Sequence, residues 1–352
     1  MSKRVDAMDL LRAVAILMVL LAHAVFTYGA PDYIAPLQIF GMGVDLFFVL
    51  SGWLLGSALI KERKRAGRID VKNFWIRRWF RTFPAYYAVL ALLTLQQYLV
   101  NPDFTIDWSY VFFYQNYQMP LEYFSISWSL AVEEQFYLVI APLLLLLGKW
   151  GRKFETSILL LLALSPFVLR YLGWYEHTKQ THVRLDCCAV GVLLAHVYYT
   201  YQSVWNSLRA KAFSIAILLS LIVAGFLVAR YISTYDAVSP DYLLLAITFG
   251  FWVVWANTTT VEFNRHFKSA FYYVSTRSYS MYLLHPEALA LTKKVMVDAP
   301  FVLYFGFMFA VTCLLSEALY RVVEQPFLRL RDRDWSFFKT QKGVNKCVEL
   351  PD

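Results

Sequence analysis

The chain has 352 residues, of which 59% are hydrophobic and only 16% are charged, and its formal net charge is +8. A soluble domain typically carries about 25% charged residues. This composition therefore excludes a plain cytosolic enzyme, a disordered chain, a collagen and a disulfide scaffold. The 28 Phe, 24 Tyr and 11 Trp also suit rings placed at membrane interfaces. We predict an all-α, polytopic membrane protein.

Ten segments are apolar over roughly the 20 residues that a membrane-crossing helix requires. The predicted spans are residues 12–30, 44–60, 82–100, 128–147, 156–173, 187–202, 213–232, 242–258, 271–290 and 300–320. The basic segment between the second and third spans is predicted to form an interfacial helix on the cytoplasmic side. We expect a transmembrane domain over residues 1–330 and a cytoplasmic tail over residues 331–352.

The distribution of Lys and Arg gives an independent test of this count, because cytoplasmic loops carry the excess of basic residues. With both termini in the cytoplasm, 25 basic residues fall on the inner side. The outer loops then contain only Lys179, Arg184, Lys293 and Lys294. Missing one span would exchange the sides of all later loops and destroy the pattern. Topology thus explains the net charge, and no nucleic-acid partner is needed.

The first span contains Arg12 and His23, and ionisable groups within a membrane mark function by default. They are 11 residues apart, which places them about 20° from a common helix face and roughly 16 Å apart along the axis. The alternative is a snorkelling Arg together with a polar His packed between helices. In the second span, Asp45 is a plausible partner for a buried His or Arg, whereas Ser51-Gly52 is typical of close helix packing.

Arg78 and Arg81 are neighbours on one helix face beside Trp75 and Trp79. The pattern fits either a cytoplasmic phosphate site or an interfacial helix attracted to anionic lipid.

The fourth span begins at Trp128 and carries the adjacent carboxylates Glu133 and Glu134. Adjacent side chains point about 100° apart, so at most one need face a shared cavity. Glu133 lies at a depth comparable to that of His23, and we predict that these two residues converge.

Three further motifs follow. Arg184 and Asp186 precede the sixth span, and His285 lies toward the outer side of the ninth. The spacing of the histidines fits no zinc pattern, so we expect no metal. Glu324-Gln325-Pro326 is predicted to be a helix end, because proline does not continue a helix.

Together these segments resemble the membrane-bound acyltransferase-3 family of multi-span O-acyltransferases, over roughly residues 6–330. The motifs follow the family's order: Arg12 with His23, Gly43 to Gly52, Arg78 with Arg81, Trp128 to Glu133, Arg184 with Asp186, Ser278 to His285, and Glu324 to Pro326. Some members append an extracytoplasmic esterase-like domain. We expect none here, so transfer would be completed by the membrane domain or by a separate partner.

The resemblance implies an acyl-CoA donor, usually acetyl-CoA, with no bound cofactor. The implied acceptor is a hydroxyl of a cell-envelope glycan, such as a lipopolysaccharide O-antigen or an exopolysaccharide, and the implied location is the bacterial inner membrane. Arg12 and His23 are expected to be essential, and Arg12, Arg78 and Arg81 would bind the donor. Acceptor binding or structural support is expected from Trp128, Arg184, Asp186 and His285. Membrane lipids surround the spans, and the sequence does not address the oligomeric state.

The mechanistic hypothesis is direct transfer, with His23 as the general base that takes the proton of the acceptor hydroxyl. Glu133 or Asp45 would orient the imidazole ring, and the residues do not decide between them. An acyl-histidine intermediate remains an alternative. No Ser or Cys has a sequence context that marks it as the nucleophile.

Two other classes of protein are considered. A secondary transporter or lipid-linked glycan flippase would suit ten spans with charges near the bilayer centre, but the chain lacks duplicated halves. A membrane glycosyltransferase would give no reason for the stripe formed by Arg12 and His23.

Overall fold

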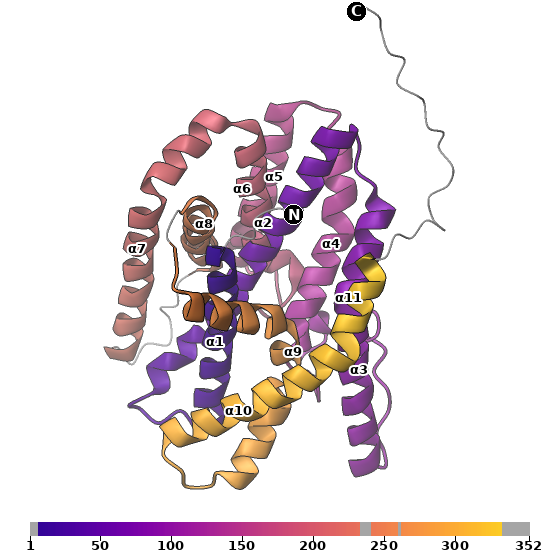
Figure 1. Cartoon of the computed structure of the whole chain (residues 1–352), viewed down its shortest axis with the longest axis vertical. Helices are drawn as coiled ribbons and strands as arrows, with labels where there is room; N and C mark the ends of the chain where they lie inside the picture. Colours follow the sequence, from indigo (N-terminus) through magenta and orange to yellow (C-terminus); the bar gives the residue numbers. More distant parts are fainter. Residues whose placement is uncertain (1–5, 233–240, 260–261, 333–352) are drawn as a thin grey trace, which may run out of the picture.

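The computed structural model describes residues 6–232, 241–259 and 262–332, and within these ranges the protein is helical without a strand (Figure 1). The α-helices are α1 (Asp6–Thr27), α2 (Gly43–Ala66), α3 (Val71–Val100), α4 (Ser127–Leu147), α5 (Arg152–Tyr171), α6 (Asp186–Thr200), α7 (Gln202–Ile232), α8 (Tyr242–Thr258), α9 (Arg265–Val295), α10 (Phe301–Leu319) and α11 (Gln325–Asp332). Short 3-10 turns η1 (Ala35–Met42), η2 (Gln115–Tyr117) and η3 (Thr181–Val183) lie in the connections, and the π-helical turn η4 (Tyr320–Glu324) joins α10 to α11. The predicted all-α class is confirmed.

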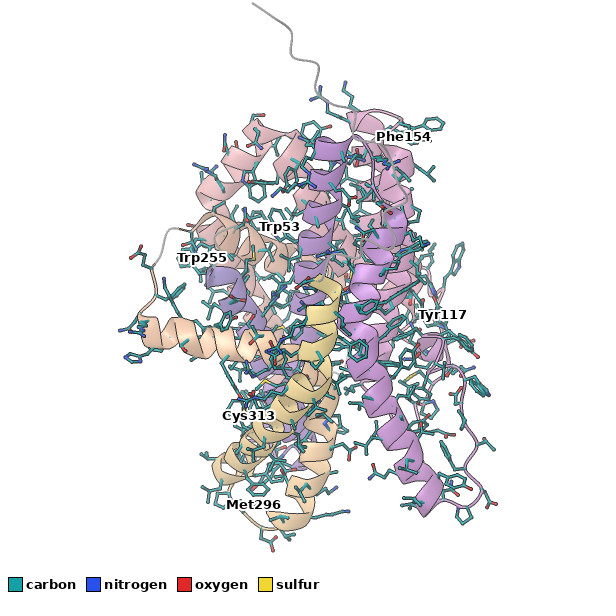
Figure 2. All side chains as sticks on the ribbon, turned by 45° about the vertical axis from the view of Figure 1, so that its right-hand side comes forward. Trp53, Tyr117, Phe154, Trp255, Met296 and Cys313 are labelled. Atoms are coloured by element: carbon teal, nitrogen blue, oxygen red, sulfur yellow. The ribbon has the colours of Figure 1, made fainter. Side chains whose placement is uncertain are left out.

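Each of the ten predicted spans coincides with one of the helices α1 to α10. Within the described ranges, seven helical stretches are long and apolar enough to cross a membrane, while α6 and α8 are apolar but shorter. The ninth helix is long but too polar to meet the same criterion. Its first part runs across the long axis of the molecule in both Figure 1 and Figure 2 and exposes Phe267 and Tyr272. Exposed rings on a transverse helix suit a membrane interface.

The basic segment after α2 forms the first turns of α3, so the expected interfacial helix is continuous with the third span. Asp70 begins α3 by accepting a hydrogen bond from the backbone N–H of Asn73 at 3.0 Å. The helix then runs through Pro84 to Val100 without interruption. We call the end of the bundle at which α2 passes into α3 the basic end, because the arginines of α3 lie there.

The predicted helix end at Pro326 is wrong. The chain passes from α10 through η4 into α11 in a single helical path, in which Pro326 is the second residue of α11. The π-helical turn directly before Gln325 interrupts the regular hydrogen-bond ladder, so the missing N–H of Pro326 falls at an irregular part of the helix. Glu324 in the π-helical turn is buried and accepts a hydrogen bond from Ser280 at 3.2 Å.

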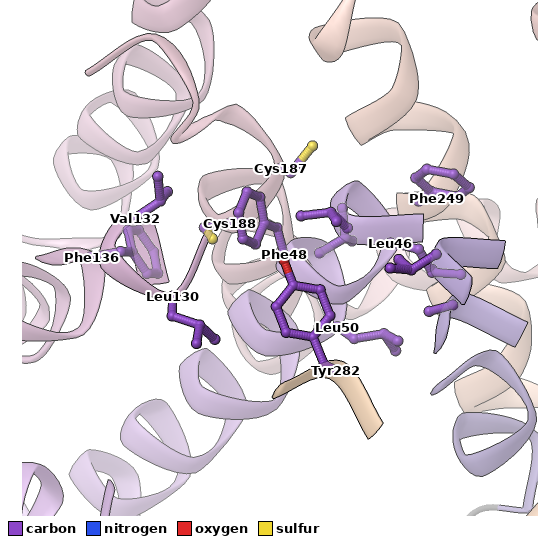
Figure 3. Close-up of a cluster of buried hydrophobic side chains, with 14 of the residues drawn as sticks. Leu46, Phe48, Leu50, Leu130, Val132, Phe136, Cys187, Cys188, Phe249 and Tyr282 are labelled. Atoms are coloured by element: carbon purple, nitrogen blue, oxygen red, sulfur yellow. The ribbon is translucent and has the colours of Figure 1, made fainter. Parts of the chain in front are cut away.

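The backbones of α2 and α6 approach each other closely in the core. A Cβ atom on Gly52 would lie 2.0 Å from the carbonyl oxygen of Cys188, and one on Gly191 would lie 2.3 Å from that of Val49. The close packing predicted for Ser51-Gly52 is therefore present. Both cysteines at the start of α6 are fully buried in the same core (Figure 3).

We expect Gly52→Ala to lower the thermal unfolding midpoint of the detergent-solubilised protein, because overpacking typically costs about 1–3 kcal/mol. The matched control is Gly225→Ala in α7, where an added Cβ meets no heavy atom within 4 Å. That control should be neutral or stabilising, because alanine is the better helix former. Equal midpoints for Gly52→Ala and the unmodified protein would contradict the close approach.

Candidate functional site

A cavity of about 380 Å³ lies between α1, α2, α3, α4, α9 and α11. Five arginines line it: Arg12, Arg77, Arg78, Arg81 and Arg331. Its lining extends from exposed Arg77 at the basic end to the buried hydroxyl groups of Ser129 and Tyr282. Figure 3 shows Tyr282 of α9 among core side chains of α2 and α4. The three arginines predicted to bind the donor thus share one cavity.

Arg78 is held in the cavity by contacts with Tyr137. Its guanidinium lies over the ring of Tyr137, 4.2 Å from the centroid, and its Nη2 donates a hydrogen bond to the Tyr137 hydroxyl at 2.9 Å. That hydroxyl donates in turn to Ser51 at 2.8 Å. The Nε of Arg78 is buried and has no hydrogen-bond partner among the described residues.

Glu133 belongs to the surroundings of Arg78. Its carboxylate lies 3.6 Å from Nη2 of Arg78, and Glu134 lies 4.0 Å from Nε of the same side chain. Glu133 also lines the arginine cavity, which His23 does not line in the described part of the chain. The structure therefore does not bear out the predicted convergence of Glu133 with His23, because α4 turns this carboxylate toward α3.

Asp45 is bound to a different cation. Its Oδ1 lies 2.8 Å from Nη2 of Arg184 and also accepts a hydrogen bond from the thiol of Cys187 at 3.5 Å. Both Asp45 and Arg184 are buried. Of the two partners considered for Asp45, a buried arginine is the one found. The structure thus brings neither predicted carboxylate against the ring of His23.

The ring against His23 is instead that of His285, at a centroid separation of 4.9 Å. Nδ1 of His23 is 2.9 Å from the carbonyl oxygen of Val19, and Nδ1 of His285 is 2.7 Å from that of Tyr282. His285 is fully buried, and its ring also contacts the ring of Tyr282 at 5.6 Å. Tyr282 therefore lines the inner end of the cavity and also contacts the histidine pair.

Arg184 is enclosed by aromatic rings. Its guanidinium carbon lies 3.7 Å from the ring centroid of Tyr242 and 5.3 Å from that of Trp128. Nε and Nη1 of Arg184 are buried without a hydrogen-bond partner in the part of the chain described. The ammonium group of Lys179 lies 5.9 Å from the ring centroid of Trp128, another of the residues expected to bind or support the acceptor, and burial lowers the pKa of Lys179. The cationic groups of Arg184 and Lys179 thus both lie over the ring of Trp128.

Asp186 is paired with Arg170 at 2.8 Å and not with Arg184, its neighbour in the motif. Arg170 also binds Asp241, so that three elements are tied together around α6. This geometry fits the structural-support alternative for Asp186.

Sequence reasoning missed several residues that line or order the cavity. Arg77 and Arg331 were counted only as topological charges, and Tyr137 was not considered. Tyr282 donates to the carbonyl oxygen of Ile126 at 3.1 Å, and its hydroxyl lies 2.6 Å from that of Ser129. The available signal was periodicity, since Tyr282 and His285 are three residues apart on α9 and lie on one face.

The long apolar helices define a polytopic membrane protein, and five arginines line a cavity near part-buried His23 and buried His285. A family model described as an acyltransferase domain matches residues 5–321. The chain belongs to this acyltransferase-3 family, and the resemblance inferred from the motifs is confirmed.

Three relatives illustrate the similarity. The peptidoglycan O-acetyltransferase OatA of Listeria monocytogenes is 26% identical over 393 residues, which cover 99% of this chain and 61% of the relative. The O-acetyltransferase OatA of Staphylococcus aureus is 25% identical over 371 residues, 96% of this chain and 59% of the relative. A Staphylococcus aureus strain COL protein provisionally named an O-acetyltransferase is 27% identical over 363 residues, 92% of this chain and 57% of the relative. The chain thus spans about three fifths of the length of these curated relatives, and no solved structure matches it significantly.

Proposed function

We propose that this protein transfers an acetyl or other short acyl group from cytoplasmic acyl-CoA to a hydroxyl of a cell-envelope glycan. The protein would lie in the inner membrane with its basic end and both termini in the cytoplasm. The observation that carries the proposal is the cavity with five arginines whose inner end adjoins the histidine pair through Tyr282.

The cavity suits the chemistry of coenzyme A. Arginine forks match the geometry of phosphate oxygens, and the five arginines of the lining offer a site for the phosphates of the donor. Between them and the inner end, apolar side chains such as Leu54, Leu55 and Leu130 line the path. The pantetheine arm would follow this path and bring the thioester toward Tyr282. The volume of about 380 Å³ falls in the range of pockets for small molecules and cofactors.

His23 supplies the base in this proposal. A carbonyl oxygen can only accept a hydrogen bond, so Nδ1 of His23 carries its hydrogen toward Val19, and Nε2 retains a lone pair. Nε2 takes the proton of the acceptor hydroxyl as that oxygen attacks the thioester carbon. The carbon–oxygen bond forms, the carbon–sulfur bond breaks, and the imidazolium returns its proton to the departing thiolate.

The acceptor class is supported by the relatives, one of which is named for the peptidoglycan that it acetylates. In the proposed orientation, Arg184, Lys179 and Trp128 would lie toward the outer side, where a glycan would enter. Arg184 retains two buried N–H groups that could bind polar groups of a sugar.

Calorimetry with the purified, detergent-solubilised protein tests the donor. We expect saturable acetyl-CoA binding that Arg78→Ala weakens by about 10- to 100-fold, the size expected when one charge-assisted hydrogen bond is lost. Free CoA should bind through the same phosphates. Arg209→Ala, on an exposed part of α7 away from the cavity, is the matched control and should bind as the unmodified protein does.

An absence of acetyl-CoA binding by demonstrably folded protein would refute the proposed donor. A secondary transporter or lipid-linked glycan flippase would then be the class to test, by transport assays.

A further inference from the structure

His285 has an unusual hydrogen-bonding state for a fully buried side chain. Its Nδ1 lies 2.7 Å from the carbonyl oxygen of Tyr282, whereas its Nε2 is buried with no hydrogen-bond partner among the described residues. Buried polar atoms are nearly always hydrogen-bonded, and an exception calls for an explanation.

The two backbone carbonyls fix the tautomers of both histidines. Because each carbonyl oxygen accepts a hydrogen from Nδ1, the neutral rings of His23 and His285 each keep a lone pair on Nε2. Two lone pairs cannot hydrogen-bond to each other, but one added proton makes one nitrogen a donor and the other an acceptor. Ring centroids 4.9 Å apart allow facing ring nitrogens to reach hydrogen-bond distance.

We propose that His285 is a positioning residue for His23, whose Nε2 accepts a hydrogen bond from the imidazolium that forms when His23 takes the acceptor proton. The inference rests on the proposed function. During transfer the hydroxyl proton moves to Nε2 of His23. The ring of His23 then turns so that this N–H donates to Nε2 of His285, and it turns back to protonate the thiolate when the carbon–sulfur bond breaks. His285 thus performs the role that the sequence analysis assigned to a carboxylate.

The charges around the pair agree with this role. The charge of Lys179, in the loop before α6, interacts electrostatically with His23. His23 in turn interacts electrostatically with His285. The nearby carboxylates are bound to other cations: Asp45 of α2 to Arg184, and Glu133 of α4 to Arg78. The imidazolium of His23 therefore has no carboxylate partner among the described residues, and the neutral acceptor beside it is His285.

The test compares His285→Phe, which removes the acceptor, with His285→Gln, whose amide oxygen can still accept a hydrogen bond. We expect His285→Phe to lower kcat for O-acetyl transfer about 100-fold, the lower range for acid–base assistance, with the KM for acetyl-CoA unchanged. The acidic limb of the pH–rate profile should move to lower pH, because protonated His23 loses its hydrogen-bond acceptor. His285→Gln should restore part of kcat. Its acidic limb should lie between those of His285→Phe and the unmodified protein.

The matched control is His196→Gln, since His196 is also fully buried but hydrogen-bonds to Thr156 of α5. His196→Gln should leave the acidic limb of the pH–rate profile at the same pH as in the unmodified protein. An unshifted limb in both His285 variants would overturn the proposal and make His285 a packing residue, whatever the loss of kcat.

Nitrogen-15 NMR of the unmodified protein provides a reading without substitution. The two imidazoles should gain one proton jointly as the pH falls, and independent titration of the two rings would overturn the pairing. Failure of the unmodified protein to bind acetyl-CoA would instead refute the proposed function.

Discussion

Replacing His23 by alanine is expected to abolish O-acetyl transfer while leaving acetyl-CoA binding intact. Loss of a general base typically costs about 10²- to 10⁴-fold in rate. Binding should persist because the five cavity arginines remain and His23 is not part of the described cavity lining. Transfer from radiolabelled acetyl-CoA to a glycan fraction measures the first quantity, and calorimetry measures the second.

His266→Ala is the matched control. His266 is exposed near the start of α9, so this substitution removes a histidine without altering His23 or His285. It should retain full transfer. Normal acetylation by the His23→Ala protein would exclude His23 as the base. Loss of both binding and transfer would mean that the His23 ring also supports the donor cavity.

Replacing Asp45 by alanine is expected to destabilise the protein severely. The change leaves the guanidinium of Arg184 buried without its carboxylate at 2.8 Å. Removing one partner of a buried ion pair typically costs about 3–5 kcal/mol, because the remaining charge stays desolvated. Thermal unfolding in detergent should show a large drop in midpoint, together with loss of folded protein during purification.

The double variant Asp45→Ala/Arg184→Met should recover part of this stability, because it removes the uncompensated charge as well. As a control, Asp332→Asn alters surface ion pairs with Arg331 and Arg77 and should change stability by no more than about 1 kcal/mol. If Asp45→Ala keeps its unfolding midpoint and its acetyl-CoA affinity but loses transfer, Asp45 acts in the chemistry, as the sequence analysis proposed.

The positions of the helices could be predicted because apolar length is a local property of the chain. All ten predicted spans became helices, and Arg12, Arg78 and Arg81 came together in one cavity. The polar part of α9 shows the limit of this reasoning. A helix that contains a predicted span can begin as a transverse helix, because the direction of a helix depends on its neighbours.

Partners across helices could not be predicted. The helical period fixes which side chains share a face of one helix, but the rotation of that helix against its neighbours is set by packing. Glu133 and His23 are predicted at comparable depths, yet α4 presents Glu133 to Arg78. Asp45 meets Arg184 across more than a hundred residues of sequence, which no local pattern encodes. The pairing of His23 with His285 is equally distant in sequence.

Helix α3 is one continuous element that connects the arginine cavity with the long loop before α4. Its 30 residues extend about 45 Å, and its first turns carry the cavity arginines. Further along, the hydroxyls of Tyr86 and Tyr87 donate to the backbone carbonyls of Tyr110 and Val111 at 2.8 Å, which fastens the long loop before α4 to the same helix. The arginine cavity and this loop are thus attached to one continuous helix, with Pro84 between the two attachment points.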